Sequence, residues 1–195
     1  ILTATSGDTG SAALSGFSDV EGTKIIVFYP KHGISAVQER QMVSCKGKNT
    51  CVVAVEGNFD DAQSGVKNIF ATLDLPEGVK LSSANSINIG RLAPQVAYYF
   101  KAYGDLIKNN EIKMGDKVNF IVPTGNFGDI LAGFFAMNMG LPVGKLVCAS
   151  NENKVLTDFF ENGSYNKNRE FHVTKSPSMD ILISSNLERL LYLVC

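Results

Sequence analysis

The fold is decided by one stretch of the sequence, Thr124-Gly125-Asn126-Phe127-Gly128-Asp129, which joins two apolar runs. The preceding run, 118–122, is rich in β-branched residues and predicts a buried strand. The following run, 130–139, is apolar almost all the way round and predicts a buried helix. A glycine-rich turn between such elements presents free backbone N–H groups at the positive end of the helix dipole, which is a phosphate-binding geometry. On these grounds alone, a phosphate site and a turn that binds nothing stay equally open.

The composition is that of a soluble globular protein, with 195 residues, 45% of them hydrophobic, and a formal net charge of −1. This length allows one or two domains with cores of their own. The near-neutral charge argues against a nucleic-acid surface, and no apolar run reaches the roughly 20 residues that span a bilayer. Four cysteines and two histidines show no metal-binding spacing, so we expect no metal site and a reducing cytoplasm.

The two ends of the sequence indicate an internal fragment of a larger protein. The chain begins at Ile1 inside a predicted strand, with neither an initiator Met nor a signal peptide, and ends at Cys195 inside an apolar helical pattern. We therefore expect further residues on both sides of this sequence.

Strand and helix patterns alternate along the chain, which predicts parallel sheets flanked by helices. The predicted strands are 1–5, 24–29, 50–55, 118–122, 145–150 and, as a weaker pattern, 181–184. The first predicted helix ends at about residue 17. The others cover 35–43, 59–73, 89–108, 130–139, 155–161 and 187–194, with Ser35 and Asn186 as N-caps. The aromatic residues of the 89–108 helix are expected to pack against other elements.

Two loops of the form Gly-x-x-Gly, Gly7–Gly10 and Gly125–Gly128, open helices after apolar strands. Two such helix N-termini facing one cleft would suit a charged small molecule. Neither loop completes the Gly-x-Gly-x-x-Gly pattern and no Walker-A motif occurs, so nucleotide binding has little support.

Five motifs occur in order along the chain. They are Thr5-Ser6-Gly7-Asp8-Thr9-Gly10-Ser11-Ala12, Tyr29-Pro30-Lys31, Asn85-Ser86-Ile87-Asn88 with Arg91, Pro123-Thr124-Gly125-Asn126-Phe127-Gly128, and Pro177-Ser178-Met179-Asp180 with Ser185-Asn186 and Glu188-Arg189. Together they resemble the threonine synthases of the longer bacterial and fungal type, over essentially all 195 residues.

The resemblance implies an α/β fold of the fold-type-II pyridoxal-phosphate enzymes, with two three-layer lobes and largely parallel sheets. Residues 1–88 would be the small mobile lobe, and residues 89–195 an incomplete part of the large cofactor-binding lobe. The implied reaction converts O-phospho-L-homoserine and water to L-threonine and phosphate, with pyridoxal 5'-phosphate as cofactor. Two alternatives stay open: a non-catalytic phosphate-ligand binding module, and another fold-type-II lyase acting on a phosphorylated hydroxy amino acid.

The resemblance also assigns site residues. Those expected at the cofactor phosphate are Gly125, Asn126, Phe127, Gly128 and Asp129. Those expected at the substrate are Ser6, Gly7, Asp8, Thr9, Ser86, Asn88 and Arg91. For three of these residues a local role stays open. Asp8 would cap the following helix, Asn88 would cap the 89–108 helix, and Arg91 would form an ion pair on the surface of that helix.

A catalytic residue is expected to be absent. In the family the Schiff-base lysine precedes the Ser-Gly-Asp-Thr-Gly loop in a Phe-Lys-Asp-type motif, and no lysine of this sequence has that context. We therefore expect these 195 residues alone to be inactive and to form no Schiff base with the cofactor.

Overall fold

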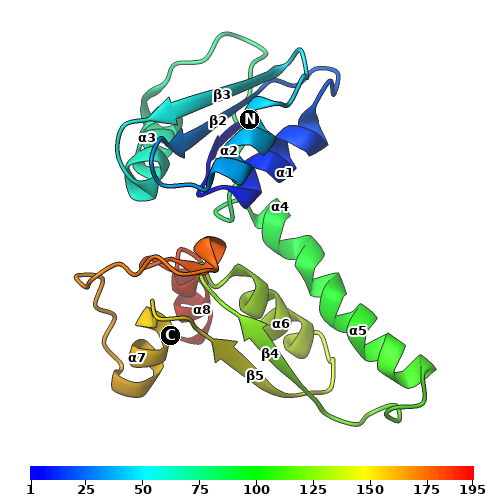
Figure 1. Cartoon of the computed structure of the whole chain (residues 1–195). Helices are drawn as coiled ribbons and strands as arrows, with labels where there is room; N and C mark the ends of the chain where they lie inside the picture. The colour runs from blue at the N-terminus through cyan, green and yellow to red at the C-terminus, as the bar shows by residue number, and fades with distance from the viewer. The chain divides into compact units, whose positions relative to one another are not determined.

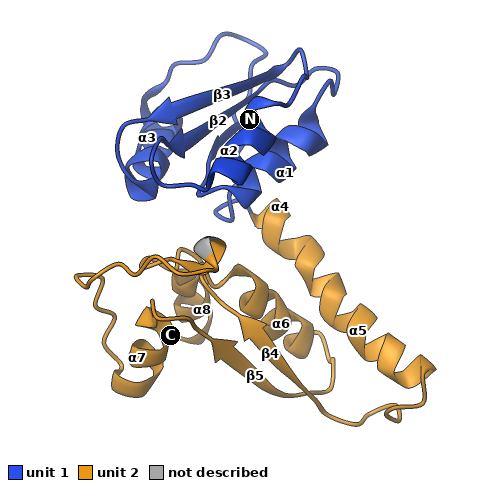
Figure 2. Cartoon of the chain, viewed as in Figure 1, with its two compact units in different colours: residues 1–88 blue, residues 89–195 orange. Residues whose placement is uncertain are grey.

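The computed structural model describes residues 1–195 except for the side chain of Pro177. Figure 1 shows the course of the chain, and Figure 2 its two compact units, Ile1–Asn88 (unit 1) and Ile89–Cys195 (unit 2). The identity of these units as a mobile lobe and a cofactor-binding lobe stays a prediction. The elements in chain order are β1 Leu2–Ala4, α1 Asp8–Phe17, β2 Ile25–Pro30, α2 Ala36–Val43, β3 Thr50–Val55, α3 Phe59–Thr72, α4 Ile89–Leu92, η1 Ala93–Gln95, α5 Val96–Lys108, β4 Val118–Pro123, α6 Gly128–Asn138, β5 Val143–Ala149, α7 Val155–Asn162, η2 Pro177–Met179 and α8 Leu187–Val194.

Unit 1 is a three-layer α/β structure around the parallel sheet β1-β2-β3. Alternate residues of β2 point to opposite faces. Val27 lies in the core with α1 and α2, whereas Phe28 packs into the core made with α3. Figure 1 shows α1 and α2 together on one side of this sheet. The three-layer lobe with a parallel sheet that the sequence predicted is confirmed for this unit.

Unit 2 contains the parallel pair β4-β5, with α5 and α6 packed on one face. The ring of Tyr99 on α5 meets Phe120 of β4 edge-on, with 4.9 Å between centroids. On the opposite face Ile121 and Val147 are paired in register and are 73% and 41% exposed. The third layer expected for this lobe is therefore not formed by the described residues.

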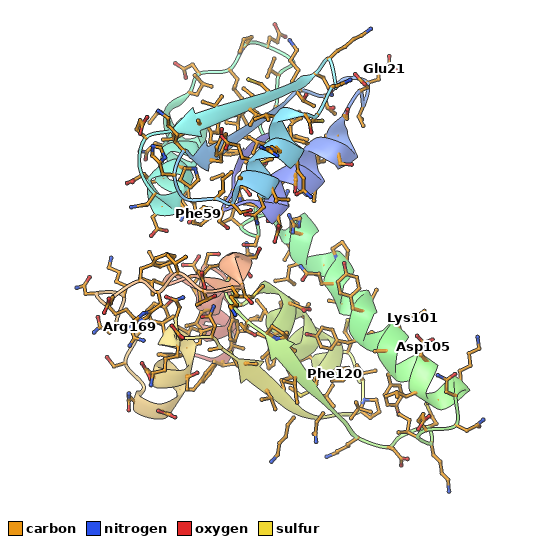
Figure 3. The ribbon with its side chains drawn as sticks, in the orientation of Figure 1. Glu21, Phe59, Lys101, Asp105, Phe120 and Arg169 are labelled. Atoms are coloured by element: carbon orange, nitrogen blue, oxygen red, sulfur yellow. The ribbon has the colours of Figure 1, made fainter. Side chains whose placement is uncertain are left out.

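The helix predicted over 89–108 is interrupted. The structure has α4, a 3-10 turn at Ala93–Gln95 and then α5. Pro94 explains the break, because proline has no N–H and its ring clashes with the preceding turn of an α-helix. Along α5, Lys101 and Asp105 lie one turn apart and form an exposed ion pair of 2.5 Å (Figure 3).

Two further sequence predictions are wrong in detail. Residues 181–184 form no strand, because their polar groups bond to side chains and loops rather than to a neighbouring strand. Among the aromatic residues of α5, Tyr99 and Tyr103 are buried as expected, but Tyr98 is 61% exposed.

In the described part of the chain, every helix falls short of the length and hydropathy that crossing a bilayer requires.

Candidate functional site

The loop between β4 and α6 carries backbone donors that the protein itself leaves unused. Within the described part of the chain, the N–H groups of Gly125, Asn126 and Phe127 donate to no other protein group. Gly125 and Phe127 are buried, and buried backbone donors are normally paired. Phe127, the N-cap residue of α6, has the left-handed backbone angle φ 66°. These donors at the positive end of a buried helix make a cradle for an anion.

Gly128, the fourth residue predicted at the cofactor phosphate, has a different role. The N–H group of Gly128 donates to Oδ1 of Asn126 over 3.0 Å, so the Asn126 side chain closes a small turn inside the loop. This bond fixes the shape of the loop around the three unused donors.

The carbonyl groups of the loop are held by a segment 60 residues further along the chain. The buried hydroxyl of Ser184 donates to the carbonyl oxygen of Gly125 over 2.6 Å. Asn186 donates to the carbonyl oxygen of Asn126 twice, from its backbone N–H (3.0 Å) and from its Nδ2 (3.2 Å). With their carbonyls engaged by the protein, the loop residues keep only their N–H groups for a ligand.

Asn186 is the N-cap residue of α8, as predicted, but its side chain makes no capping hydrogen bond. It is 0% exposed, and its Oδ1 accepts a hydrogen bond of 3.0 Å from Nε of Arg189. Its amide therefore stabilises the Gly125–Gly128 loop. The sequence motif contained this residue but gave no indication of that partner.

The side chain of Asp129 is engaged away from the loop. The phenol of Tyr99 on α5 donates to the carbonyl oxygen of Asp129 (2.9 Å) and lies 3.2 Å from its Oδ1. Burial raises the pKa of Tyr99 well above its usual value, and the Asp129 carboxylate raises it further. The phenol consequently stays protonated and remains a donor at neutral pH. Of Asp129, only the backbone N–H is left as a candidate for anion binding.

The polar stretch between α7 and α8 is organised by the carboxylate of Asp180. It accepts hydrogen bonds from the side chains of Asn151 (2.7 Å) and Asn153 (3.1 Å) and from both the N–H and the hydroxyl of Thr174 (2.8 and 2.7 Å). The residue after it, Ile181, lies against the Gly125–Gly128 loop, since a Cβ added to Gly125 would be 3.0 Å from its Cδ1.

In unit 1, the predicted substrate loop 6–9 opens helix α1. Gly7 is the N-cap residue, and Asp8 is the first residue of the helix. The side chain that satisfies the helix end is Thr5, whose buried hydroxyl accepts hydrogen bonds of 2.9 Å from the N–H groups of both Gly7 and Gly10. The alternative in which Asp8 caps this helix is therefore wrong. Its carboxylate instead accepts a hydrogen bond from Gln38.

A second predicted substrate segment, 86–88, follows Asn85, which binds the end of β1 just before this loop. The Asn85 amide accepts from the N–H of Ala4 (2.9 Å) and donates to the carbonyl of Ala4 (2.5 Å), as a neighbouring strand would. Asn88 donates to the carbonyl oxygen of Ser83 over 2.8 Å. Residues 81 positions apart are thus held side by side within unit 1, whereas Arg91 is an exposed residue of α4 in unit 2.

Replacing Asn85 with alanine is expected to destabilise unit 1 by about 2–3 kcal/mol, because both polar groups of Ala4 are then buried without partners. Thermal unfolding followed by circular dichroism measures the change. The exposed Asn68→Ala on α3 is the matched control and should stay within about 0.5 kcal/mol of the unchanged protein. Equal stability of the two variants would contradict the role of Asn85.

The described residues hold no group of three or more His, Cys, Asp or Glu that is placed to bind a metal ion. Lys31, which follows β2, forms an exposed ion pair of 2.5 Å with Glu56.

Comparison with known proteins identifies relatives over the whole chain. Threonine synthase-like 1 of Macaca fascicularis is 48% identical over 206 residues, covering 100% of this chain and 28% of that protein. The threonine synthase of Pseudomonas aeruginosa is 46% identical over 192 residues, covering 98% of this chain and 40% of that protein. The chain thus spans between about a quarter and two fifths of the length of these relatives. No protein-family model matches it.

Solved structures give the same relationship. The structure of a threonine synthase from Brucella melitensis with bound PLP superposes with a TM-score of 0.83 at 46% identity, over 98% of this chain and 40% of that one. A PLP-dependent aspartate racemase, at 17% identity and a TM-score of 0.70, shares the fold alone. The chain is therefore a homologue of threonine synthases, with the fold of the fold-type-II enzymes, as its motifs predicted.

Proposed function

We propose that this chain forms the cofactor-phosphate and substrate sites of a threonine synthase, which converts O-phospho-L-homoserine and water to L-threonine and phosphate. The single observation that carries the proposal is the set of unused N–H groups at Gly125, Asn126 and Phe127. It is supported by identities of 42% to 48% to threonine synthases and threonine synthase-like proteins over nearly the whole chain.

The residues present fit the phosphate of pyridoxal 5'-phosphate. The loop offers several N–H donors at the N-terminus of an 11-residue buried helix, and its carbonyl oxygens, which would repel an anion, are engaged by Ser184 and Asn186. When bound, the cofactor supplies an electron sink for the α-carbon of the amino acid. The chain's own contribution is to bind and orient the phosphate end of the cofactor.

The substrate would be bound by the two segments that Asn85 holds together, through Ser6, Gly7, Asp8 and Thr9 of one and Ser86 and Asn88 of the other. Arg91 is proposed to bind the phosphate that leaves the substrate, since a guanidinium donates two parallel hydrogen bonds to such a group. A polypeptide of residues 1–195 is proposed to bind without catalysing, because none of its lysines has the context of the cofactor lysine.

The phosphate site predicts a ligand preference that the 195-residue chain itself can show. Pyridoxal 5'-phosphate should bind at least about 100-fold more tightly than pyridoxal, because charge-assisted hydrogen bonds to the phosphate each contribute about 1.5–3 kcal/mol. Isothermal titration calorimetry with both compounds measures the difference, and a Schiff-base absorption band should not develop.

Equal affinity for the two compounds would contradict the proposed phosphate loop.

The reaction is tested separately, by measuring turnover with the full-length product of the gene that encodes these residues. Release of threonine from O-phospho-L-homoserine supports the proposal, turnover of O-phosphothreonine instead indicates another lyase, and binding without any turnover indicates a binding module.

A further inference from the structure

We infer that Gln38 is a positioning residue for Asp8, an inference that rests on the function proposed above. Gln38 is the third residue of α2 and is only 8% exposed. Its Nε2 donates a hydrogen bond of 2.9 Å to Oδ1 of Asp8, the first residue of α1. One buried amide thus connects the starts of two helices at the loop that is proposed to bind the substrate.

The capping of α2 does not by itself explain a glutamine here. Oε1 of Gln38 accepts from the N–H (3.1 Å) and from the hydroxyl (2.9 Å) of Ser35, while the N–H of Gln38 donates to that hydroxyl over 3.3 Å. A glutamate would complete the same capping box, and its charge would be favoured at this end of the helix. Only the NH₂ group distinguishes the two residues, and in the structure this group binds Asp8.

The same amide lies against the backbone of the substrate loop. A Cβ added to Gly7 would be 2.3 Å from Nε2 of Gln38. From within the loop, the hydroxyl of Thr5 binds the N–H groups of Gly7 and Gly10. Gly7 is thereby held by contacts with two buried side chains. This arrangement fixes the backbone from which the side chain of Asp8 projects.

This arrangement defines what Asp8 can recognise. The residue is exposed, and an ionised carboxylate only accepts hydrogen bonds, so its ligand group must be an N–H or O–H donor. A donated hydrogen bond to Oδ1 restricts the rotation of the carboxylate, in the way that a supporting shell orients the groups that touch a substrate. Gln38 acts on the reaction only through Asp8.

The test is a set of three variants, Gln38→Glu, Asp8→Asn and the two combined. Gln38→Glu keeps the capping box but places two carboxylates together, and it should lower the melting temperature of the 195-residue chain by about 4–8 °C. The combined variant exchanges the amide and the carboxylate, so the melting temperature should return to within about 2 °C of the original.

Measurements of activity distinguish a positioning role of Gln38 from an effect on stability alone. In the full-length gene product, Gln38→Glu should lower kcat/KM about 10–100-fold, and the combined variant should remain as impaired although its stability has recovered. Ser35→Ala removes a cap without removing the amide of Gln38, so it should lower the melting temperature while kcat/KM changes less than about threefold.

Unchanged kcat/KM in Gln38→Glu, or no thermal recovery in the combined variant, would overturn the inference. If the unaltered gene product does not convert O-phospho-L-homoserine, the proposed function fails, and the thermal comparison then decides alone whether Gln38 holds Asp8. The two failures are therefore distinguishable.

Discussion

Replacing Asn186 with leucine is expected to destabilise unit 2 by about 2–4 kcal/mol, because two hydrogen bonds of a buried side chain are lost, one of them from a charged donor. Leucine has a similar shape but cannot donate to the carbonyl oxygen of Asn126 or accept from Nε of Arg189. The Asn186 side chain is 0% exposed, so both of its bonds lie inside the folded unit. Thermal and urea unfolding measure this loss.

The same substitution should weaken the binding of pyridoxal 5'-phosphate about 10–100-fold, because the carbonyl oxygen of Asn126 then keeps only the backbone N–H of residue 186 and the loop is held less firmly. Calorimetric titration at a temperature well below the unfolding transition measures the affinity. The matched control is Asn168→Leu, at an exposed position, which should change stability by less than about 0.5 kcal/mol and leave the affinity unaltered. Loss of stability with unchanged affinity would mean that Asn186 supports the fold but not the loop.

The fold was largely predictable because its signals are local. Apolar runs and the residues that break them placed the helices and strands to within a few residues, as with 118–122 for β4 and 59–73 for α3. The predictions failed where a single residue or a distant partner overrides the pattern. Pro94 interrupts a helix whose apolar periodicity continues through it, and 181–184 forms no strand because its partners are loop and side-chain groups.

The candidate site was predictable only as a set of motifs. Sequence motifs gave Asn126 and Asp8, but the residues that bind them were assigned no such role, because these partners lie far along the chain. Gln38 is 30 residues from Asp8 and Asn186 is 60 from Asn126. A buried amide that pairs with a distant group has no periodicity and no spacing rule, so only the folded structure identifies it.

Gly7 is the position where the smallest substitution should have the largest effect. Its backbone, at φ 137° and ψ −78°, lies in a region that residues with a Cβ rarely adopt. A Cβ would also stand 2.3 Å from Nε2 and 2.4 Å from Cδ of Gln38. Gly7→Ala therefore combines backbone strain with overpacking and should destabilise unit 1 by about 3 kcal/mol or more. Thermal unfolding and limited proteolysis of unit 1 measure the effect.

Gly16→Ala is the control within the same helix. Gly16 has no positive φ, and a Cβ there would meet nothing within 4 Å, so alanine should stabilise α1 by about 0.5–1 kcal/mol. Opposite signs for two identical substitutions nine residues apart would show that the constraint is local to the loop. The proposed role of the loop adds a second expectation. If the added Cβ displaces Gln38, the hydrogen bond from Gln38 to Asp8 is lost, so any folded Gly7→Ala protein should bind substrate no better than the Gln38→Glu variant. A Gly7→Ala protein as stable as the original would show that Gln38 does not lie against this loop, and would also remove the support for a fixed Asp8.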